Sequence, residues 1–189
     1  MRSCSEYKNL ALKSLSDNWG ICILATLILM VVEVCMAYVF PLILVALPIE
    51  FGLTVIYLNL VWRTQPTMKD LFTGFQDYGR VFLTLLLRDV YSLLWSLLLV
   101  VPGIVKMYSY AMTPYLMIED PNLKYDAAIS ASSRMMKGHK AELFWLHLSF
   151  IGWIVLCWIT CGIGFLFLAP YMNAAQAHFY EDLKAEQGA

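Results

Sequence analysis

Charged side chains are scarce in this chain of 189 residues, because Asp, Glu, Lys and Arg make up only 14% of it. Soluble domains carry about 25%, so the composition excludes a disordered chain and an ordinary water-soluble enzyme. The formal net charge of -1 gives no field that would attract a polyanion, which excludes a nucleic-acid partner. Apolar residues are abundant instead: 60% are hydrophobic and the mean hydropathy is +0.66. Residues 1–189 are therefore expected to form a single membrane domain.

Motifs for chemistry are also missing. The sequence has no G-x-S-x-G, H-E-x-x-H or C-x-x-C pattern and no glycine-rich phosphate loop, each of which marks a known kind of active site. The five cysteines cannot all pair within the chain, because their number is odd. Cys157 and Cys161 lie one helical turn apart, but two thiols with a distant His147 make a poor metal site. We therefore expect no enzyme activity, cofactor or metal, and thiols that pack as small apolar groups.

Long apolar runs dominate the chain. A helix that crosses the hydrocarbon core needs about 20 mostly apolar residues. Six stretches qualify, at about 20–40, 42–62, 81–101, 102–118, 141–160 and 162–180. Joined in pairs, they give three hairpins at 20–62, 81–118 and 141–180, so the sequence predicts an all-α integral membrane protein with six transmembrane helices. The fourth stretch is the shortest and could be tilted, broken or partly re-entrant.

Uncharged helix breakers mark the tight turns within these hairpins. They are Phe40-Pro41, Val101-Pro102-Gly103 and Cys161-Gly162. Proline is tolerated in the first turn of a helix, because its missing N–H would have no intrahelical partner there. Pro41 and Pro102 are therefore predicted to start the second and fourth membrane helices.

Basic residues fall almost entirely on one side of this arrangement. The segments outside the hairpins hold Arg2, Lys8, Lys13, Arg63, Lys69, Arg80, Lys124, Arg134, Lys137, Lys140 and Lys184. The three tight turns hold no basic residue, so the positive-inside rule places both termini in the cytoplasm. The first span has too long an apolar core for a cleaved signal. The expected location is the cytoplasmic (inner) membrane, with multiple passes.

A period of about sixty residues relates the three hairpins. Each is preceded by a short amphipathic stretch, at about 5–18, 67–78 and 123–139, and a proline recurs in each returning helix at Pro48, Pro114 and Pro170. The pattern indicates a three-fold internal repeat, although any three hairpins of similar length look alike. The amphipathic stretches are expected to lie as helices in the cytoplasmic headgroup plane, either as anchors or as a docking surface.

The most specific pattern lies in the C-terminal half. It consists of Pro102-Gly103-Ile104, Tyr108-Ser109-Tyr110, Thr113-Pro114-Tyr115, Glu119-Asp120-Pro121, the stretch 135–140, the stretch 148–153, Gly162-Ile163-Gly164, Pro170-Tyr171 and Phe179-Tyr180. In order and spacing, these motifs resemble a bacterial family of polytopic integral membrane proteins known only as a domain of unknown function. The region is also distantly similar to the membrane region of glycerophosphodiester phosphodiesterases. The resemblance implies a bacterial membrane protein but brings no catalytic residues.

Residues that could ionise inside the expected spans form the candidate buried polar site. They are Glu33, Glu50, Arg88, Asp89, Lys106 and His147. Insertion scales assign about 2.5–3.5 kcal/mol to a charge at the centre of a span, so each residue is a functional candidate. Arg88 and Lys106 are close enough to the ends of their spans to reach headgroups, and Asp89 could neutralise Arg88 or another span's cation. His147 is expected to be a hydrogen-bonded residue of the bundle.

Glu33 and Glu50 are the strongest of these candidates. At 1.5 Å per residue, both lie roughly 12–14 Å from the turn at Pro41. They belong to adjacent antiparallel helices and so share a depth near the bilayer centre. Two carboxylates close together in a low dielectric would hold a proton or bind a cation. Periodicity alone leaves open whether the two side chains face each other.

Three function classes are compatible with these features. A non-catalytic membrane module that interacts with lipids, a protein partner or a second copy of the chain is favoured, because catalytic motifs are absent. The alternative is a small transporter or channel that uses the buried charged residues and the prolines of its spans. The third class is an accessory to a lipid-metabolising enzyme, which only the distant phosphodiesterase-like resemblance suggests.

Overall fold

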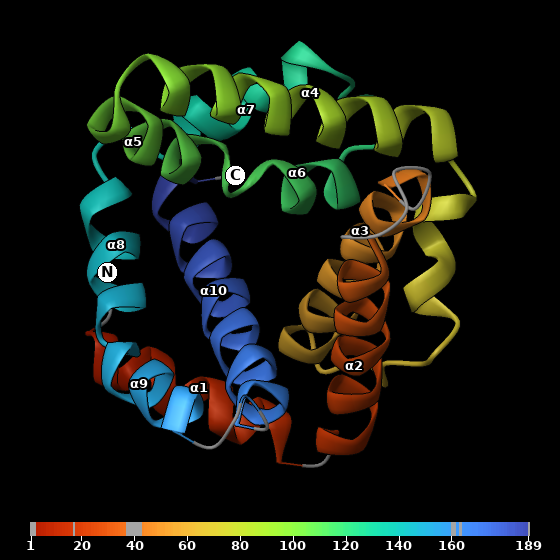
Figure 1. Cartoon of the computed structure of the whole chain (residues 1–189), viewed down its shortest axis with the longest axis vertical. Helices are drawn as coiled ribbons and strands as arrows, with labels where there is room; N and C mark the ends of the chain where they lie inside the picture. Colours follow the sequence, from red (N-terminus) through yellow and green to blue (C-terminus); the bar gives the residue numbers. More distant parts are fainter. Residues whose placement is uncertain (1–2, 17, 37–42, 160–161, 163, 189) are drawn as a thin grey trace.

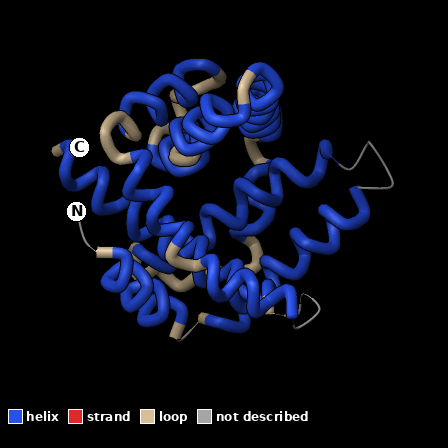
Figure 2. Tube along the Cα trace, turned by 60° about the vertical axis from the view of Figure 1, so that its left-hand side comes forward, coloured by secondary structure: helices blue, strands red, loops and turns tan. Residues whose placement is uncertain are grey.

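The structure is a computed structural model of the chain. It describes residues 3–16, 18–36, 43–159, 162 and 164–188, and within them the side chains of 32–36, 43 and 159 lie outside the description. Throughout these ranges the regular elements are helices and no strand occurs (Figures 1 and 2). The all-α prediction is therefore confirmed for the part of the chain that is described.

The first half of the chain contains α1 (Cys4–Leu15), α2 (Trp19–Met36), α3 (Ile43–Val61), the short 3-10 helix η2 (Asp70–Phe75) and α4 (Tyr78–Leu98). The second half contains α5 (Val100–Tyr110), α6 (Thr113–Glu119), α7 (Asp126–Met135), α8 (Lys140–Leu148), α9 (Ile151–Ile159) and α10 (Phe165–Gln187). The amphipathic segments expected at 5–18, 67–78 and 123–139 coincide with α1, η2 and α7.

α1 is an amphipathic helix with a strong start signal. The Ser3 hydroxyl accepts a hydrogen bond from the Glu6 N–H, and the Glu6 carboxylate accepts one from the Ser3 N–H at 2.6 Å, which is a capping box. The buried side chains recur at Tyr7, Ala11 and Leu15, the spacing of one helical face. α1 and the described start of α2 are bent by 101° relative to each other, so α1 lies across the direction of α2 (Figure 1).

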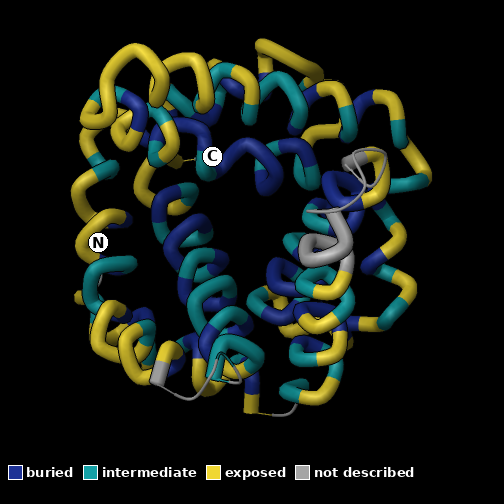
Figure 3. Tube along the Cα trace, in the orientation of Figure 1, coloured by how far each residue is buried: buried dark blue, intermediate teal, exposed yellow. Residues whose placement is uncertain are grey.

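α10 is the central helix of the core. It packs against α1, α2, α3, α7, α8 and α9, and Figure 3 shows it as mostly buried or half-buried. Ala174, Ala175 and Ala177 are fully buried, and such small residues let neighbouring helices approach closely. α4 has a different direction. In Figure 1 it runs across the top of the view, whereas α2 and α10 run from top to bottom.

The stretch expected as the fourth span is broken into α5 and α6. Pro114 lies in the first turn of α6, and it can neither donate to the residue four positions back nor avoid its carbonyl. Ser132 of α7 satisfies backbone groups at the break: its hydroxyl accepts from the Met112 N–H at 3.2 Å and donates to the Ser109 carbonyl at 2.9 Å. The break was one of three possibilities that the sequence left open, and α7 holds it in place.

The stretch expected as the fifth span is also interrupted, between α8 and α9. The carbonyl of Ser149 at this break accepts a hydrogen bond from the Lys8 ammonium of α1 at 2.7 Å. A cation near the end of a helix is favourable because it faces the negative end of the helix dipole. The last stretch, expected over 162–180, forms α10, which continues to Gln187.

Two glycines allow α3 and η2 to pack backbone against backbone. A Cβ atom added at Gly52 of α3 would lie 1.9 Å from the Leu71 carbonyl oxygen. A Cβ added at Gly74 of η2 would lie 2.3 Å from the Pro48 carbonyl oxygen. Any larger residue at either position would therefore force the two elements apart.

Among the described residues, three segments are long and apolar enough to cross a membrane: Leu44–Val61, Tyr78–Leu98 and Lys140–Trp158. The third of these counts α8 and α9 together as one span. A fourth arises if the bent pair of α1 and α2 counts as one span. Six spans and a three-fold repeat are not shown by the part of the chain described. The coarser prediction, helices suited to a membrane, is confirmed.

Candidate functional site

A cavity of about 540 Å³ with a partly polar lining lies among α2 to α6 and α10. Small-molecule sites commonly have volumes of about 300–1,000 Å³, so the cavity is large enough for a ligand. Its polar lining consists of Glu50, Thr54, Tyr57, Arg88, Asp89, Ser92, Ser96, Tyr110, Tyr115, Asn173 and Gln176. These residues come from four separate regions of the chain, which only the fold brings together.

α3 contributes one polar stripe to this cavity. Glu50, Thr54 and Tyr57 line it, and their spacing of four and three residues places them on one face of the helix. The Thr54 hydroxyl donates to the Glu50 carbonyl at 3.1 Å, and the Tyr57 hydroxyl lies 2.9 Å from the Thr26 hydroxyl of α2. The apolar helix therefore carries its polar groups inward.

α4 contributes the second stripe, with Arg88, Ser92 and Ser96 at steps of four residues. The Ser92 hydroxyl donates to the Arg88 carbonyl at 2.9 Å, and the Ser96 hydroxyl donates to the Ser92 carbonyl at 2.8 Å. Hydroxyls bonded in this way to their own helix remain able to accept a hydrogen bond from a ligand.

Arg88 lies between two carboxylates at the centre of the site. One guanidinium nitrogen donates to the Glu50 carboxylate at 3.1 and 3.4 Å, and the Nε–H donates to the Asp89 carboxylate at 2.8 Å. The Arg88 side chain is only 15% exposed, whereas those of Glu50 and Asp89 are 38% and 46% exposed. Arg88 is thus paired with both Asp89 and Glu50, and its reach to headgroups stays a prediction.

The three charged side chains leave the cavity with a formal charge of -1. Every other residue that lines it is neutral. Both carboxylates keep exposed surface, whereas the buried guanidinium is already shared between them. The arrangement is therefore suited to accept a cationic or hydrogen-bond-donating group rather than an anion.

α10 supplies two amide side chains, Asn173 and Gln176. Gln176 also forms a side-chain hydrogen bond with His147 of α8, whose Nδ1 lies 3.3 Å from the Tyr108 hydroxyl. His147 thus lies beside the cavity as a hydrogen-bonded residue. Among the described residues, no group of three His, Cys, Asp or Glu side chains could hold a metal ion.

The remaining candidates are placed elsewhere. The Lys106 ammonium lies over the Trp95 ring, 4.8 Å from its centroid, and 5.8 Å from the centroid of Tyr110. Lys106 does not line the cavity, although its neighbour Tyr110 does. The side chain of Glu33 lies outside the described residues, so a pair with Glu50 stays a prediction. The partner that the structure gives Glu50 is Arg88.

Sequence reasoning missed the neutral members of the site. Ser92, Ser96, Asn173 and Gln176 were not singled out, because an uncharged polar residue in an apolar helix is common. A signal was present, however: Arg88, Ser92 and Ser96 recur every four residues, and Asn173 and Gln176 are three apart. Polar residues at helical spacing in an apolar run indicate a face turned away from lipid.

Comparison with known protein families gives a match over the C-terminal half of the chain. A family described as "Protein of unknown function (DUF975)" matches residues 97–187. No curated protein and no solved structure matches the chain. The matched region runs from the end of α4 to the end of α10, so it includes Asn173 and Gln176 but not Glu50, Arg88 or Asp89. The similarity to a domain of unknown function is confirmed there, while neither membrane polytopy nor a phosphodiesterase likeness is shown.

Proposed function

We propose that the chain is a non-catalytic integral membrane module of a bacterial inner membrane whose outer surface contacts lipid. The observation that carries the proposal is the tip of the α4–α5 hairpin. Six of its apolar residues are 60–83% exposed: Leu93, Leu97, Leu98, Leu99, Val100 and Val101. A soluble monomer rarely exposes a contiguous apolar patch of this kind, and lipid chains would cover it without loss.

The α8–α9 region supports the same proposal. Trp145, Trp153 and Trp158 are 59%, 54% and 76% exposed, and Ile151 and Val155 beside them are exposed as well. Tryptophan is enriched where the hydrocarbon core meets the headgroups. Figure 3 shows exposed residues along the outer sides of both regions, so two separate surfaces would contact lipid.

The proposed topology has six spans in three hairpins, with both termini in the cytoplasm. The distribution of basic residues supports it, and so does the bend of 101° between α1 and α2, which suits a headgroup-plane helix followed by a span. Lipids are the proposed partners, and the docking of a protein partner or a second copy on the amphipathic helices is the alternative use of that surface.

The test is cysteine labelling of a cysteine-free chain in intact cells with a membrane-impermeant reagent. Gln65→Cys and Tyr125→Cys should react only after permeabilisation, whereas Gly162→Cys should react in intact cells. Labelling of position 65 or 125 from the outside would refute the topology. Release of the unmodified chain from membranes by carbonate would refute integral insertion.

A second candidate function is a small transporter, and the cavity around Arg88 favours it. Its net charge of -1 and the rings of Tyr57, Tyr110 and Tyr115 in its wall are suited to an organic cation, since ring faces attract ammonium groups. In proteoliposomes, uptake of a labelled small amine should fall when Glu50→Gln removes one charge. Equal uptake by the variant, or none by the wild type, would exclude transport through this cavity. A role beside a lipid-metabolising enzyme rests on the resemblance alone.

A further inference from the structure

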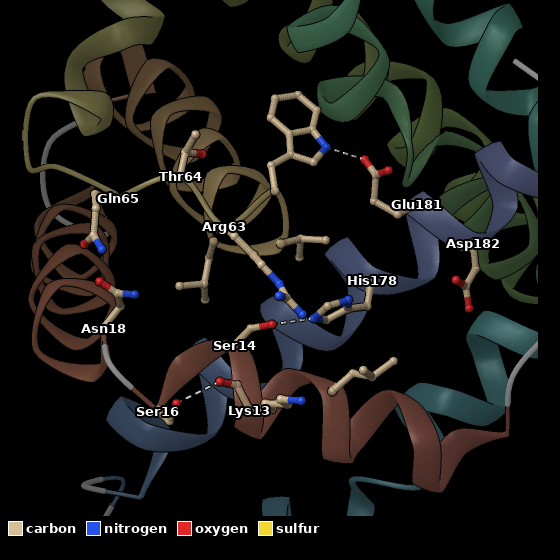
Figure 4. Close-up of a pocket in the computed structure, with 14 residues that line it drawn as sticks. Lys13, Ser14, Ser16, Asn18, Arg63, Thr64, Gln65, His178, Glu181 and Asp182 are labelled. Carbon is tan, nitrogen blue, oxygen red and sulfur yellow. Dashed lines mark hydrogen bonds between the residues drawn. The ribbon is translucent and has the colours of Figure 1, made fainter.

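A second cavity, of about 670 Å³, lies where α1, the segment after α3 and α10 meet (Figure 4). It shares no lining residue with the cavity around Arg88. Its lining is rich in groups that donate hydrogen bonds, and it belongs to the side that the basic residues place in the cytoplasm. The proposed membrane module does not use this cavity.

Two cations from different elements line the cavity: Lys13 of α1 and Arg63, which follows α3. Across the described residues, neither takes part in an ion pair. Figure 4 shows the Arg63 side chain pointing toward the Ser14–His178 pair, in which the Ser14 hydroxyl lies 2.7 Å from the His178 Nε2. Guanidinium, ammonium, hydroxyl and imidazole groups are therefore gathered in one place.

The backbone at Arg63 is one that favours glycine. Its φ is 58°, and the Thr64 N–H donates to the Asn59 carbonyl at 3.0 Å while the Arg63 N–H donates to the Leu60 carbonyl at 3.3 Å. This pair of bonds is the Schellman motif, in which the left-handed residue is usually glycine. An arginine here carries a steric cost, although it places a long cation at the cavity.

The wall on α10 also contains the carboxylates of Glu181 and Asp182. Glu181 accepts a hydrogen bond from the Trp62 indole at 2.7 Å, and Figure 4 shows it turned toward that indole, away from Arg63. Figure 4 shows Asp182 on the far side of His178 from Arg63, so neither carboxylate lies beside the guanidinium. A ligand with an anionic group would meet the cations without meeting Glu181.

We propose that this cavity binds a phosphate ester, with Arg63 and Lys13 as its charged donors. A guanidinium matches the geometry of phosphate oxygens in a two-point contact, and an ammonium adds a point charge. Ser14, which also lines the cavity, adds a hydroxyl beside the His178 imidazole, whereas the Thr64 hydroxyl already donates to the Asn59 carbonyl at 2.9 Å. The phosphate belongs either to a soluble phosphorylated metabolite or to a lipid headgroup, since the cavity lies at the expected membrane surface.

Calorimetric titration of the full chain in phosphate-free detergent tests the site, with sn-glycerol 3-phosphate as the probe and glycerol as the uncharged comparison. Arg63→Gly should weaken binding of the phosphate ester about tenfold or more, the loss expected for one charged hydrogen-bond donor. Lys13→Gln should weaken it as well. Lys137→Gln, which removes an exposed cation outside the cavity, should bind as the wild type does.

The same Arg63→Gly variant separates binding from folding, because glycine suits the left-handed backbone. Its thermal unfolding temperature should equal or exceed that of the wild type while binding is lost. Repeating the measurement in phosphatidylcholine nanodiscs with and without phosphatidic acid separates the two sources. Phosphatidic acid retained by the wild type but not by Arg63→Gly indicates a lipid, and binding of glycerol 3-phosphate indicates a metabolite. If neither probe distinguishes the wild type from Arg63→Gly, the proposal is overturned.

Discussion

Arg88 shares its guanidinium between Glu50 on α3 and its own neighbour Asp89 on α4. Removing one partner of a buried ion pair lowers the free energy of unfolding, because the remaining charge is desolvated and no longer has an opposite charge beside it. Both carboxylates here are more than a third exposed, so solvent screening reduces that cost. The contact also joins two helices that belong to different hairpins.

Arg88→Met should therefore lower the free energy of unfolding by about 2 kcal/mol, below the 3–5 kcal/mol of a fully buried pair. Adding Glu50→Gln should restore part of the loss, because the second change removes one of the uncompensated charges. Denaturant unfolding in detergent measures both variants. A double variant less stable than Arg88→Met would show that the two residues do not interact as described.

Lys184 and Glu119 give a prediction about pH outside the apolar segments. The Lys184 ammonium donates to the Glu119 carboxylate at 2.7 Å, and this hydrogen bond raises the pKa of Lys184 above its ordinary value of 10.5. The folded state therefore favours the protonated lysine, and the stability that it adds is fully present below pH 10.5 and is lost as pH rises through the raised pKa. Lys184→Met should remove this pH dependence.

Thermal unfolding followed from pH 8 to pH 11.5 checks the prediction. The wild type should lose more stability than Lys184→Met over the upper part of that range. Lys137→Met, at an exposed site, is the control and should follow the wild type. Parallel curves for the wild type and Lys184→Met would contradict the assignment.

At the residue scale, the sequence predicts which side chains are unusual but not which of them meet. Charge in an apolar run singled out Glu50, Arg88 and Asp89, because desolvation makes each costly. The contact between Glu50 and Arg88 joins positions 38 residues apart, and nothing in helical periodicity specifies a partner in another hairpin. Arg63 was counted only among the basic residues outside the hairpins, since its left-handed backbone is a property of the folded chain.

At the scale of elements, the contact between α3 and η2 depends on two absent side chains. Gly52 and Gly74 each face the other element's backbone. An interior packed at this density cannot accept an extra methyl group without moving backbone. The sequence predicts an amphipathic helix on the membrane surface over 67–78. The structure has a short 3-10 helix there that packs against the backbone of α3, and hydrophobic periodicity does not predict such a contact.

Gly52→Ala and Gly74→Ala should each destabilise the protein by about 1–3 kcal/mol, the usual range for overpacking. Gly79→Ala is the matched control, since a Cβ there would meet no atom within 4 Å. Because alanine suits a helix better than glycine, this control should unfold at an equal or higher temperature. Thermal unfolding of the three variants side by side measures the contrast. Equal stability of Gly52→Ala and Gly79→Ala would contradict the close approach.

At the scale of the whole molecule, the lengths of the apolar stretches predict where helices occur but not how the helices are oriented. Hydropathy reports that a segment is apolar and says nothing about its angle to a neighbour. α4 shows the difference, because it is long and apolar enough to span yet runs across the top of the view in Figure 1 instead of along α2 and α10. The breaks before α6 and before α9 have the same origin, since tertiary partners on α7 and α1 stabilise them.

The proposed lipid surface can be tested with two exposed apolar residues. Leu97 at the tip of the α4–α5 hairpin is 83% exposed, and Phe72 on η2 is 55% exposed. Leu97→Asp should sharply reduce the amount of protein in carbonate-washed membranes, because a carboxylate within the hydrocarbon costs about 2.5–3.5 kcal/mol. Phe72→Asp should reduce it far less, since η2 is expected at the cytoplasmic surface. Equal amounts of the two variants would argue against a lipid-covered tip.

The central position of α10 has a consequence for how the protein is made. Every helix that α10 packs against, from α1 to α9, precedes it in the chain and so leaves the ribosome first. Leu15, Ile56 and Leu146 are buried in the same core as α10. Their buried environment is complete only after Ala174 and Phe179 have been synthesised. During that interval the nascent chain exposes apolar and polar surfaces together, so the core can close only once α10 has been synthesised.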